Sequence, residues 1–543
     1  MLDEHSNIWF VLICIVWIAI RLTGVGDAGN AEWEKNVALK LNEYGWQATN
    51  GGILNWHYVF GYIENPQNHL YVNHPPGMIW LYAIFIKLFG CEWIRLIPLT
   101  FNFIGLTSIY YLSRRYFNQR TAIYSALIVS FLPCTLFLDK SLNIIILSTV
   151  FWILVTILTL RWYESERRKD MLLVMTLIVA ATQVDWVNFL LLPFIIIGIM
   201  MLVKKDYQKK YVYCMLLTFM MAGVIYLSEI IGYSMDYHDL FRYLSNQTVV
   251  GSIGMGQISF GVMQSKIITK LMLYTNPIAI LLAAMGLYWV AVSKNKKQLY
   301  ISLMFIGPFV IMIVVFNKFM YVEIAPFKLI APFIAVAGGY GITRLMNTKI
   351  SFYRPGIVVL TVMLLFVTTS VIINIALEER KALKSRVSLK IADELVRNTA
   401  NGDIIFSNLQ EKEFPFPCWE EGSWLFTSYY ANRFLRFDIK SVDQILKFKD
   451  ETRMNPTIYM YVPQAKNTNI NFNSDAPKIS FEKINVVKVD YHEEIKLSRM
   501  LSFLLMIADK WGLPATKVGM RNDKYDVYFN VVFYRIRNHE AVR

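Results

Sequence analysis

Two carboxylates stand where apolar runs end, which is where a membrane surface would meet a hydroxyl-bearing substrate. Asp27 comes shortly after the first apolar run, and Asp139 ends the third. A carboxylate can accept a proton from a hydroxyl nucleophile, and partial desolvation raises its basicity. Asp27 is therefore a candidate general base and Asp139 a second catalytic carboxylate. The alternatives are that Asp27 caps a helix beginning near Asn30, and that Asp139 is a salt-bridged helix end.

Cations near the same expected membrane face can offset the charge of a phosphate group. The candidates for phosphate binding are His74, Lys140, Lys318 and Arg242, with Lys328 as a further cation. Each of them is also explained as a contact with lipid headgroups. The supporting polar residues are Glu32, Glu34, Asn143 and Tyr321.

Histidines raise the question of a metal site. His57, His69 and His74 share one polar stretch, and Asp236 to Asp239 open another. Their spacings match no compact pattern of metal ligands. We therefore expect that no cofactor is required, and a divalent metal stays open as an alternative.

The composition indicates what kind of protein positions these residues. Of 543 residues, 55% are hydrophobic and 17% are charged, against about 45–50% apolar and about 25% charged in soluble domains. This excludes a soluble enzyme and predicts a polytopic membrane protein. The formal net charge of +14 then reports on topology, and we expect no nucleic-acid partner.

Apolar runs near the length of a spanning helix, about 20 residues, recur until about residue 375. We expect eleven spans, at 8–23, 96–112, 122–138, 144–160, 171–187, 189–203, 211–231, 275–293, 299–316, 327–343 and 356–375. The semi-apolar segment from Pro76 to Gly90 is short for a span. We expect it to form an interfacial helix on the outer leaflet.

Basic residues indicate how the chain is oriented. They gather in five alternate loops, at 114–120, 161–169, 204–210, 294–297 and 344–354. Because cytoplasmic loops are rich in Lys and Arg, we expect a multi-pass plasma-membrane protein with a cytoplasmic N-terminus. The same orientation places outside the loop 24–95, the loop from 232 to about 270, the turn 318–327 and the C-terminus.

The chain divides into two expected domains. Residues 1–375 form a transmembrane domain with a long first outer loop, and residues 376–543 form a polar extracytoplasmic α/β domain. A helical run at 383–398 and strand-like runs at 402–406, 457–462 and 525–534 predict this second domain. It carries no Gly-rich phosphate loop, so we expect the chemistry in the membrane domain.

One segment resembles a known signature. Asn73-His74-Pro75-Pro76-Gly77-Met78-Ile79-Trp80-Leu81 is followed by Leu88-Phe89-Gly90 and Arg95-Leu96. It resembles the PP-x-x-x-W-L, L-F-G and R-L pattern of GT-C integral-membrane glycosyltransferases, most closely the branch with protein O-mannosyltransferases and lipid A aminoarabinose transferase. The resemblance covers roughly residues 15–165. It implies a GT-C-like α-helical membrane fold of about eleven spans with the C-terminal α/β domain.

The resemblance also implies a function. It predicts transfer of a hexosyl or pentosyl group from a polyprenyl-phosphate-linked donor to a glycan, lipid or protein acceptor on the outer membrane face. Asp27 occupies the place of the family's base, but Ala28 follows it where the family usually has Glu, and His74 stands where Lys often precedes the prolines. One base opposite a lipid-phosphate leaving group implies inversion at the anomeric carbon. The alternative function is a transporter or flippase of a lipid-linked or anionic substrate, which would need charged or broken helices near the bilayer midplane.

Overall fold

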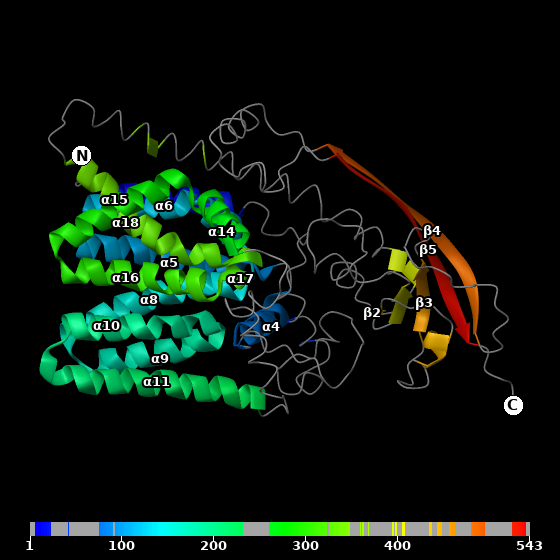
Figure 1. Ribbon diagram of the computed structural model, residues 1–543, viewed down its shortest axis with the longest axis horizontal. Helices are drawn as coiled ribbons and strands as arrows, with labels where there is room; N and C mark the ends of the chain where they lie inside the picture. Colours follow the sequence, from blue (N-terminus) through cyan, green and yellow to red (C-terminus); the bar gives the residue numbers. More distant parts are fainter. Residues whose placement is uncertain are drawn as a thin grey trace.

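The protein is described by a computed structural model in which helices form one bundle and strands form one sheet (Figure 1). The structure describes residues 6–22, 38, 42, 75, 77–90, 93–231, 260–322, 325–347, 359, 361–362, 367, 394–395, 397–398, 404–407, 434–436, 443–447, 456–461, 479–494 and 524–538.

The bundle is built from α-helices joined by short turns and by two 3₁₀ helices, η2 (Trp186–Leu191) and η3 (Ala325–Ile330). The α-helices are α1 (Ser6–Leu22), α4 (Gly77–Phe89), α5 (Leu96–Tyr116), α6 (Gln119–Phe131), α7 (Pro133–Leu138), α8 (Ile144–Ser165), α9 (Arg168–Val184), α10 (Leu192–Leu202), α11 (Lys205–Ile231), α14 (Phe260–Thr275), α15 (Pro277–Ser293), α16 (Lys296–Val315), α17 (Asn317–Val322) and α18 (Ala331–Met346).

Several of these helices have the length and apolar composition needed to cross a membrane. Within the described residues there are five, at Leu96–Tyr116, Ile145–Ser165, Lys205–Ser228, Lys296–Val315 and Ala325–Met346. Ten of the eleven expected spans coincide with helices, and the last, 356–375, lies almost entirely outside the described residues. The membrane character is confirmed, while the number of spans stays a prediction.

Two local features differ from the expected pattern. The predicted end of the loop, at about residue 270, is wrong, because helix α14 already begins at Phe260. Lys266 and Lys270 lower the mean hydropathy of this segment, so the sequence did not predict a helix here. The expected span 122–138 is divided, because Pro133 disfavours a helical residue before it and Leu132 is extended, with φ −61° and ψ 136°. This break sets α7 apart and brings Asp139 to its end.

The described residues of the five basic loops, which end at Asn347 in the fifth, lie together at one end of the bundle, as expected. Three ion pairs join them: Arg115 and Lys297 to Glu164 at 2.6 and 2.7 Å, and Lys204 to Glu166 at 3.9 Å. Next to the first and fifth loops, the hydroxyls of Thr121 and Thr343 lie 3.1 Å apart. The prediction that these loops share a side is confirmed. Which side of the membrane they occupy stays a prediction.

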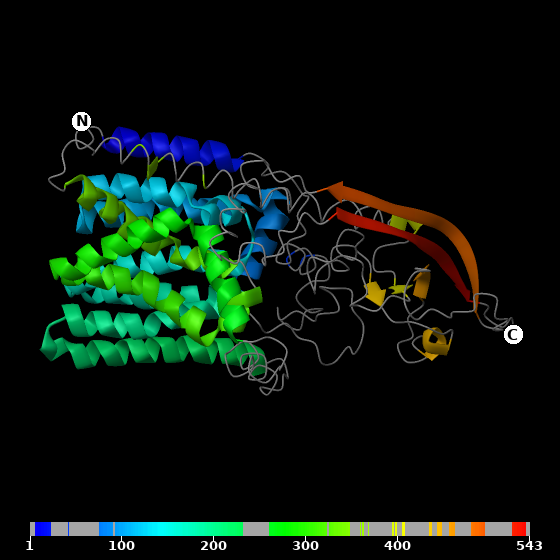
Figure 2. The same cartoon turned by 45° about the horizontal axis from the view of Figure 1, so that its top comes forward.

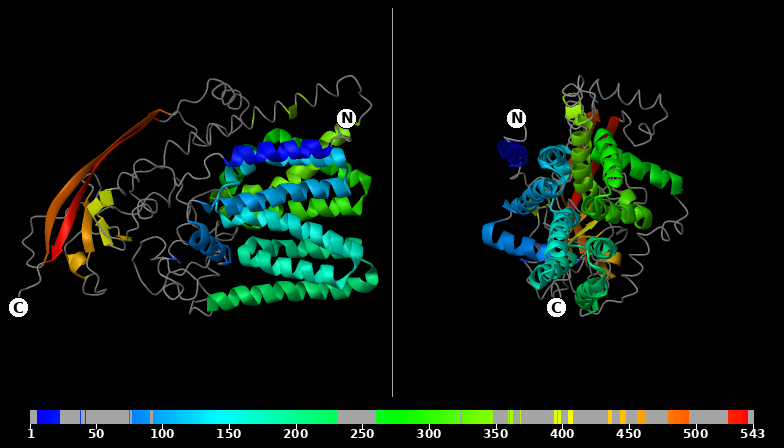
Figure 3. Two further views of the ribbon diagram at one scale, coloured as in Figure 1. Left: turned by 180° about the vertical axis from the view of Figure 1, so that it is seen from behind. Right: turned by 90° about the vertical axis from the view of Figure 1, so that its left-hand side faces the viewer.

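The opposite end of the bundle faces the sheet. Figure 1 shows α4, α14 and α17 there, and in Figure 2 the C-terminal end of α1, in dark blue, points to the same end. The segment 76–90, expected to be an interfacial helix, is helical over Gly77–Phe89 (α4). It lies at the end of the bundle (Figure 3), and its place on the outer leaflet stays a prediction.

The sheet has five strands, in the order β2-β1-β3-β5-β4. They are β1 (Ile404–Ser407), β2 (Phe434–Arg436), β3 (Pro456–Tyr461), β4 (Ile479–Glu494) and β5 (Lys524–Asn538). β1 runs parallel to β2 and β3, and β5 runs antiparallel to β3 and β4, with Ile479 opposite Asn538 and Glu494 opposite Lys524. The three expected strands are confirmed, and β2 and β4 were not expected. The domain boundary at 375 stays a prediction.

Candidate functional site

Asp139 lies between two cations at the end of the bundle that faces the sheet. Its Oδ2 accepts a hydrogen bond from Arg21 Nε at 2.5 Å, and its Oδ1 pairs with Lys328 Nζ at 2.7 Å. All three side chains are buried, with 2% of Asp139, 1% of Arg21 and 2% of Lys328 exposed. The residues come from α1, the end of α7 and η3, so distant parts of the chain meet here.

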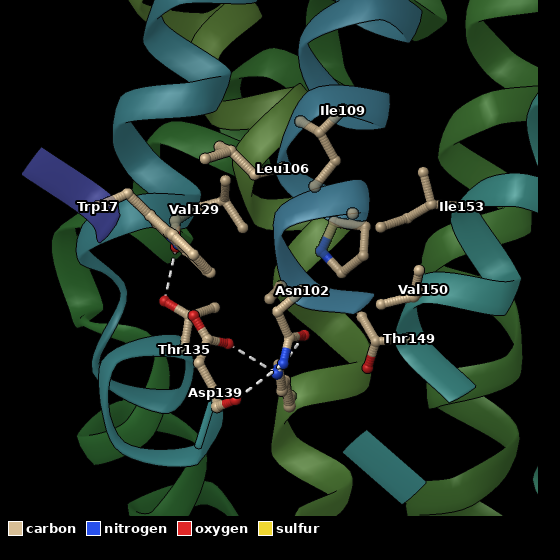
Figure 4. A pocket seen from close by; sticks show the side chains of 14 residues that line it. Trp17, Asn102, Leu106, Ile109, Val129, Thr135, Asp139, Thr149, Val150 and Ile153 are labelled. Carbon is tan, nitrogen blue, oxygen red and sulfur yellow. Dashed lines mark hydrogen bonds and ion pairs between the residues drawn. The ribbon is translucent and has the colours of Figure 1, made fainter. Parts of the chain in front are cut away.

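Asn102 of α5 completes the cluster. Its Oδ1 accepts from Lys328 Nζ at 2.7 Å, and its Nδ2 donates to the backbone oxygen of Asp139 at 3.1 Å. Lys328 Nζ thus contacts both Asn102 and Asp139, whose side chains point toward each other in Figure 4. We refer to Arg21, Asn102, Asp139 and Lys328 as the buried charge cluster.

The buried charge cluster carries one more positive than negative charge. Its two cations face a single carboxylate, and a buried charge that loses its partner is costly, by about 3–5 kcal/mol. A cavity of about 30 Å³ adjoins the cluster, with Asn102, Thr135, Asp139, Thr149 and Lys328 at its polar end. Apolar residues of α1, α5, α6, α8 and α18 line the remainder, and Figure 4 shows Trp17, Leu106, Val129 and Ile153 among them. This volume suffices for a water molecule and is too small for a sugar.

Asp139 is a salt-bridged helix end in the structure, which is the alternative that the sequence left open. Its role in catalysis stays a prediction. A metal at Asp139 does not fit, because both carboxylate oxygens already bind cationic nitrogens. Among the described residues no group of three or more His, Cys, Asp or Glu side chains could hold a metal ion. That the protein requires no cofactor stays a prediction.

The other expected site residues lie outside the buried charge cluster or outside the described residues. Lys140 follows Asp139 and is half-buried, while Asn143 caps α8 by accepting a hydrogen bond from the Ile145 amide at 3.0 Å. Lys318 and Tyr321 belong to α17, at the same end of the bundle (Figure 1). Five expected site residues lie outside the described residues: Asp27, Glu32, Glu34, His74 and Arg242.

Two members of the cluster were not identified from the sequence. Arg21 stands in the last turn of an apolar run, and ionisable groups in such runs are costly enough to suggest a role. That signal is present in the sequence, but the predicted site rests on carboxylates at the ends of apolar runs. Asn102 is an ordinary polar residue near the start of α5, and no local pattern distinguishes it.

Comparison with known proteins agrees with this architecture. Residues 73–228 match the family described as dolichyl-phosphate-mannose-protein mannosyltransferase. No curated protein sequence matches the chain. The matched segment includes the proline pair, α5 to α9 and Asp139.

Solved structures are similar over most of the chain. ArnT from Cupriavidus metallidurans bound to undecaprenyl phosphate has a TM-score of 0.57 at 12% identity, covering 88% of this chain and 96% of that one. The Archaeoglobus fulgidus oligosaccharyltransferase tethered with an acceptor peptide has a TM-score of 0.53 at 10% identity, covering 98% and 89%. The same enzyme in complex with Zn and sulfate has a TM-score of 0.50 at 12% identity, covering 84% and 68%.

Identities this low show the fold alone, while the family match adds similarity in sequence over residues 73–228. Both findings agree with the signature around the proline pair. The resemblance is thus confirmed: this membrane protein has the fold of the GT-C glycosyltransferases and is similar, from Asn73 to Ser228, to the dolichyl-phosphate-mannose-protein mannosyltransferases.

Proposed function

We propose that the protein is an inverting glycosyltransferase that moves a hexosyl or pentosyl group from a polyprenyl-phosphate donor to an acceptor on the outer membrane face. The observation that carries the donor class is the similarity to ArnT bound to undecaprenyl phosphate over 88% of this chain and 96% of that one. A glycan, a lipid or a protein is the acceptor class. The peptide tethered to the similar oligosaccharyltransferase supports a protein as one of these.

Asp27 is the proposed general base. It follows Leu22, the last residue of α1, by five positions, so a fully extended chain separates the two by at most about 18 Å. Arg21 joins the end of α1 to Asp139, which supports a place for Asp27 near the buried charge cluster. Asp139 then orients its neighbours. The proposed donor-phosphate ligands are His74, Lys140, Lys318 and Arg242, supported by Glu32, Glu34, Asn143 and Tyr321.

The reaction follows from the charges of these groups. The acceptor hydroxyl oxygen forms a bond to the anomeric carbon while the bond from that carbon to the phosphate oxygen breaks. The hydroxyl proton passes to the Asp27 carboxylate, and the lipid phosphate leaves with the bonding electrons. Cations offset the charge on the leaving phosphate. Attack from the face opposite the leaving group inverts the anomeric carbon.

The position of the buried charges argues against a flippase. Such a protein would hold charged or broken helices near the bilayer midplane. The buried charge cluster instead lies at the end of the bundle that faces the sheet. We propose that this end is extracytoplasmic, because the basic loops gather at the opposite end.

The test uses the purified protein in liposomes with a panel of undecaprenyl-phosphate sugars and a glycan, a lipid and a peptide acceptor. We expect release of undecaprenyl phosphate together with glycosylated acceptor, and loss of both in Asp27→Asn. The matched control is Asp206→Asn, which changes an exposed carboxylate at the start of α11, at the basic end of the bundle. Movement of the intact lipid-linked sugar across the bilayer without release of lipid phosphate would establish the flippase instead.

A further inference from the structure

Helix α1 lies at the edge of the bundle, where few contacts determine its position. One face packs through Ile13 and Trp17 against α5 and α6. The other faces outward, with Ile8 59%, Val11 54% and Ile15 55% exposed. Figure 2 shows the helix along the outer edge of the bundle. In a membrane these exposed side chains contact lipid.

Apolar packing alone does not determine how deep such a helix sits. Lipid tails are as apolar as the helix surface, so sliding or turning the helix changes little hydrophobic free energy. Polar contacts between helices determine depth and rotation instead, because each pair is satisfied in one register. For the end of α1 that precedes Asp27, the polar side chain is Arg21.

Arg21 makes three directional contacts within the bundle. Nε donates to Asp139 Oδ2 at 2.5 Å, Nη2 donates to the backbone oxygen of Ser130 at 2.9 Å, and the guanidinium lies 4.5 Å from the centre of the Trp17 ring. Two of the contacts reach α6 and the residue after α7. A planar guanidinium satisfies both acceptors in one orientation.

The acceptor carboxylate is itself held from other helices. Lys328 Nζ binds its Oδ1 at 2.7 Å, and Asn102 Nδ2 binds the backbone oxygen of Asp139 at 3.1 Å. The Asp139 amide donates to the Thr135 oxygen at 2.9 Å. Arg21 therefore attaches α1 to a point that η3, α5 and α7 keep in place.

We propose that Arg21 is a positioning residue, which fixes the depth and rotation of α1 and thereby the start of the segment that carries Asp27. The proposal rests on the proposed function in one respect, that Asp27 is the base. A sub-ångström to ångström error in the position of a reacting group can lower turnover by about 10²-fold. Arg21 would then affect turnover without touching the substrate.

The charge balance of the buried charge cluster allows Arg21 to be replaced without leaving an unpaired buried charge. In Arg21→Met the Lys328–Asp139 pair remains, so the cluster changes from one surplus positive charge to neutral. Methionine is apolar, unbranched and flexible, so it can fill the buried position of Arg21, and insertion and folding should be preserved. Asp139→Asn would instead leave two buried cations without a counter-charge, and its effects would mix folding with positioning.

The experiment compares Arg21→Met, Arg21→Lys and Arg114→Met in the full-length protein in liposomes. Lysine restores the charge but not the second contact to Ser130. The Arg114 variant is the matched control, because Arg114 Nη1 donates to Asn7 Oδ1 of α1 at 3.3 Å at the opposite end of the helix and is exposed. Measurements are kcat, the KM for the donor, and the immersion depth of a spin label at Leu22→Cys with the five native cysteines replaced.

We expect Arg21→Met to lower kcat by about 10²-fold with little change in the donor KM, Arg21→Lys to recover part of the loss, and Arg114→Met to resemble the parent. The label should change depth in Arg21→Met. An unchanged kcat with unchanged depth, or equal effects in Arg21→Met and Arg114→Met, would overturn the proposal. If the parent protein itself shows no turnover, the proposed function fails, while label depth still decides whether Arg21 positions α1.

Discussion

Replacing Asp139 by asparagine should destabilise the protein strongly. Asparagine keeps the shape of the side chain and removes the charge that Arg21 and Lys328 share. Two buried cations then lack a counter-charge, and loss of one partner from a buried pair costs about 3–5 kcal/mol. This is a large part of the about 5–15 kcal/mol that stabilises a typical domain.

The companion variants show whether charge is the cause. Lys328→Met keeps the Arg21–Asp139 pair and leaves Asn102 Oδ1 without its donor, a loss of about 1–3 kcal/mol. The double variant leaves one uncompensated cation where Asp139→Asn leaves two. Its cost should therefore fall below the sum of the single costs, by about 0.5–3 kcal/mol, the usual coupling between residues in contact.

The assay is unfolding in mixed micelles with rising SDS, followed by circular dichroism. The control is Glu166→Gln, which removes the partly exposed pair with Lys204 at 3.9 Å and should cost about 0–1 kcal/mol. If Asp139→Asn costs no more than this control, or if the two single costs simply add in the double variant, the reasoning about the buried charge cluster is refuted.

Three further outcomes follow from the structure and the proposed function. Asp27→Asn should lower turnover by about 10²- to 10⁴-fold, the usual share of general-base catalysis, at equal yield and donor binding; near-normal turnover would transfer the role to another carboxylate. A C-terminal tag should react with an impermeant reagent added to intact cells while a tag in the loop 204–210 does not, and labelling of both would disprove the orientation. Gly286→Ala should destabilise the bundle by more than about 1 kcal/mol in the same SDS assay, because its Cβ would clash with the backbone carbonyl oxygen of Ala337 in α18. The control Gly223→Ala should be neutral, since its Cβ meets its nearest atom at 4.0 Å, and equal stability of the two variants would contradict the close packing of α15 on α18.

Much of the fold could be predicted from short stretches of the sequence. Apolar runs predict helices because each run must be long enough to cross the hydrocarbon layer, and ten of the eleven expected runs are helical. The grouping of the basic loops at one end followed from alternation along the chain. The strands β1, β3 and β5 were recognisable from β-branched and aromatic residues, whereas the short β2 and the charged, mixed β4 were not.

The candidate site was readable only in part. The sequence identified Asp139 as a carboxylate at the end of an apolar run and left open whether it is catalytic or ion-paired. It also marked Lys328 as a cation near the same face. It did not connect either residue with Arg21 or Asn102, because nothing in the local pattern of any of these segments depends on the others.

By itself, the sequence determined the membrane class, the helical runs and the one-sided distribution of basic loops, since each depends on neighbouring residues and on the thickness of the bilayer. The tertiary structure alone decided the partners of Asp139. Arg21 and Asp139 are 118 positions apart, and Lys328 and Asn102 are 226 apart. Such pairs form because burial leaves each charge few places to be neutralised, and which charges meet depends on how the helices pack around them.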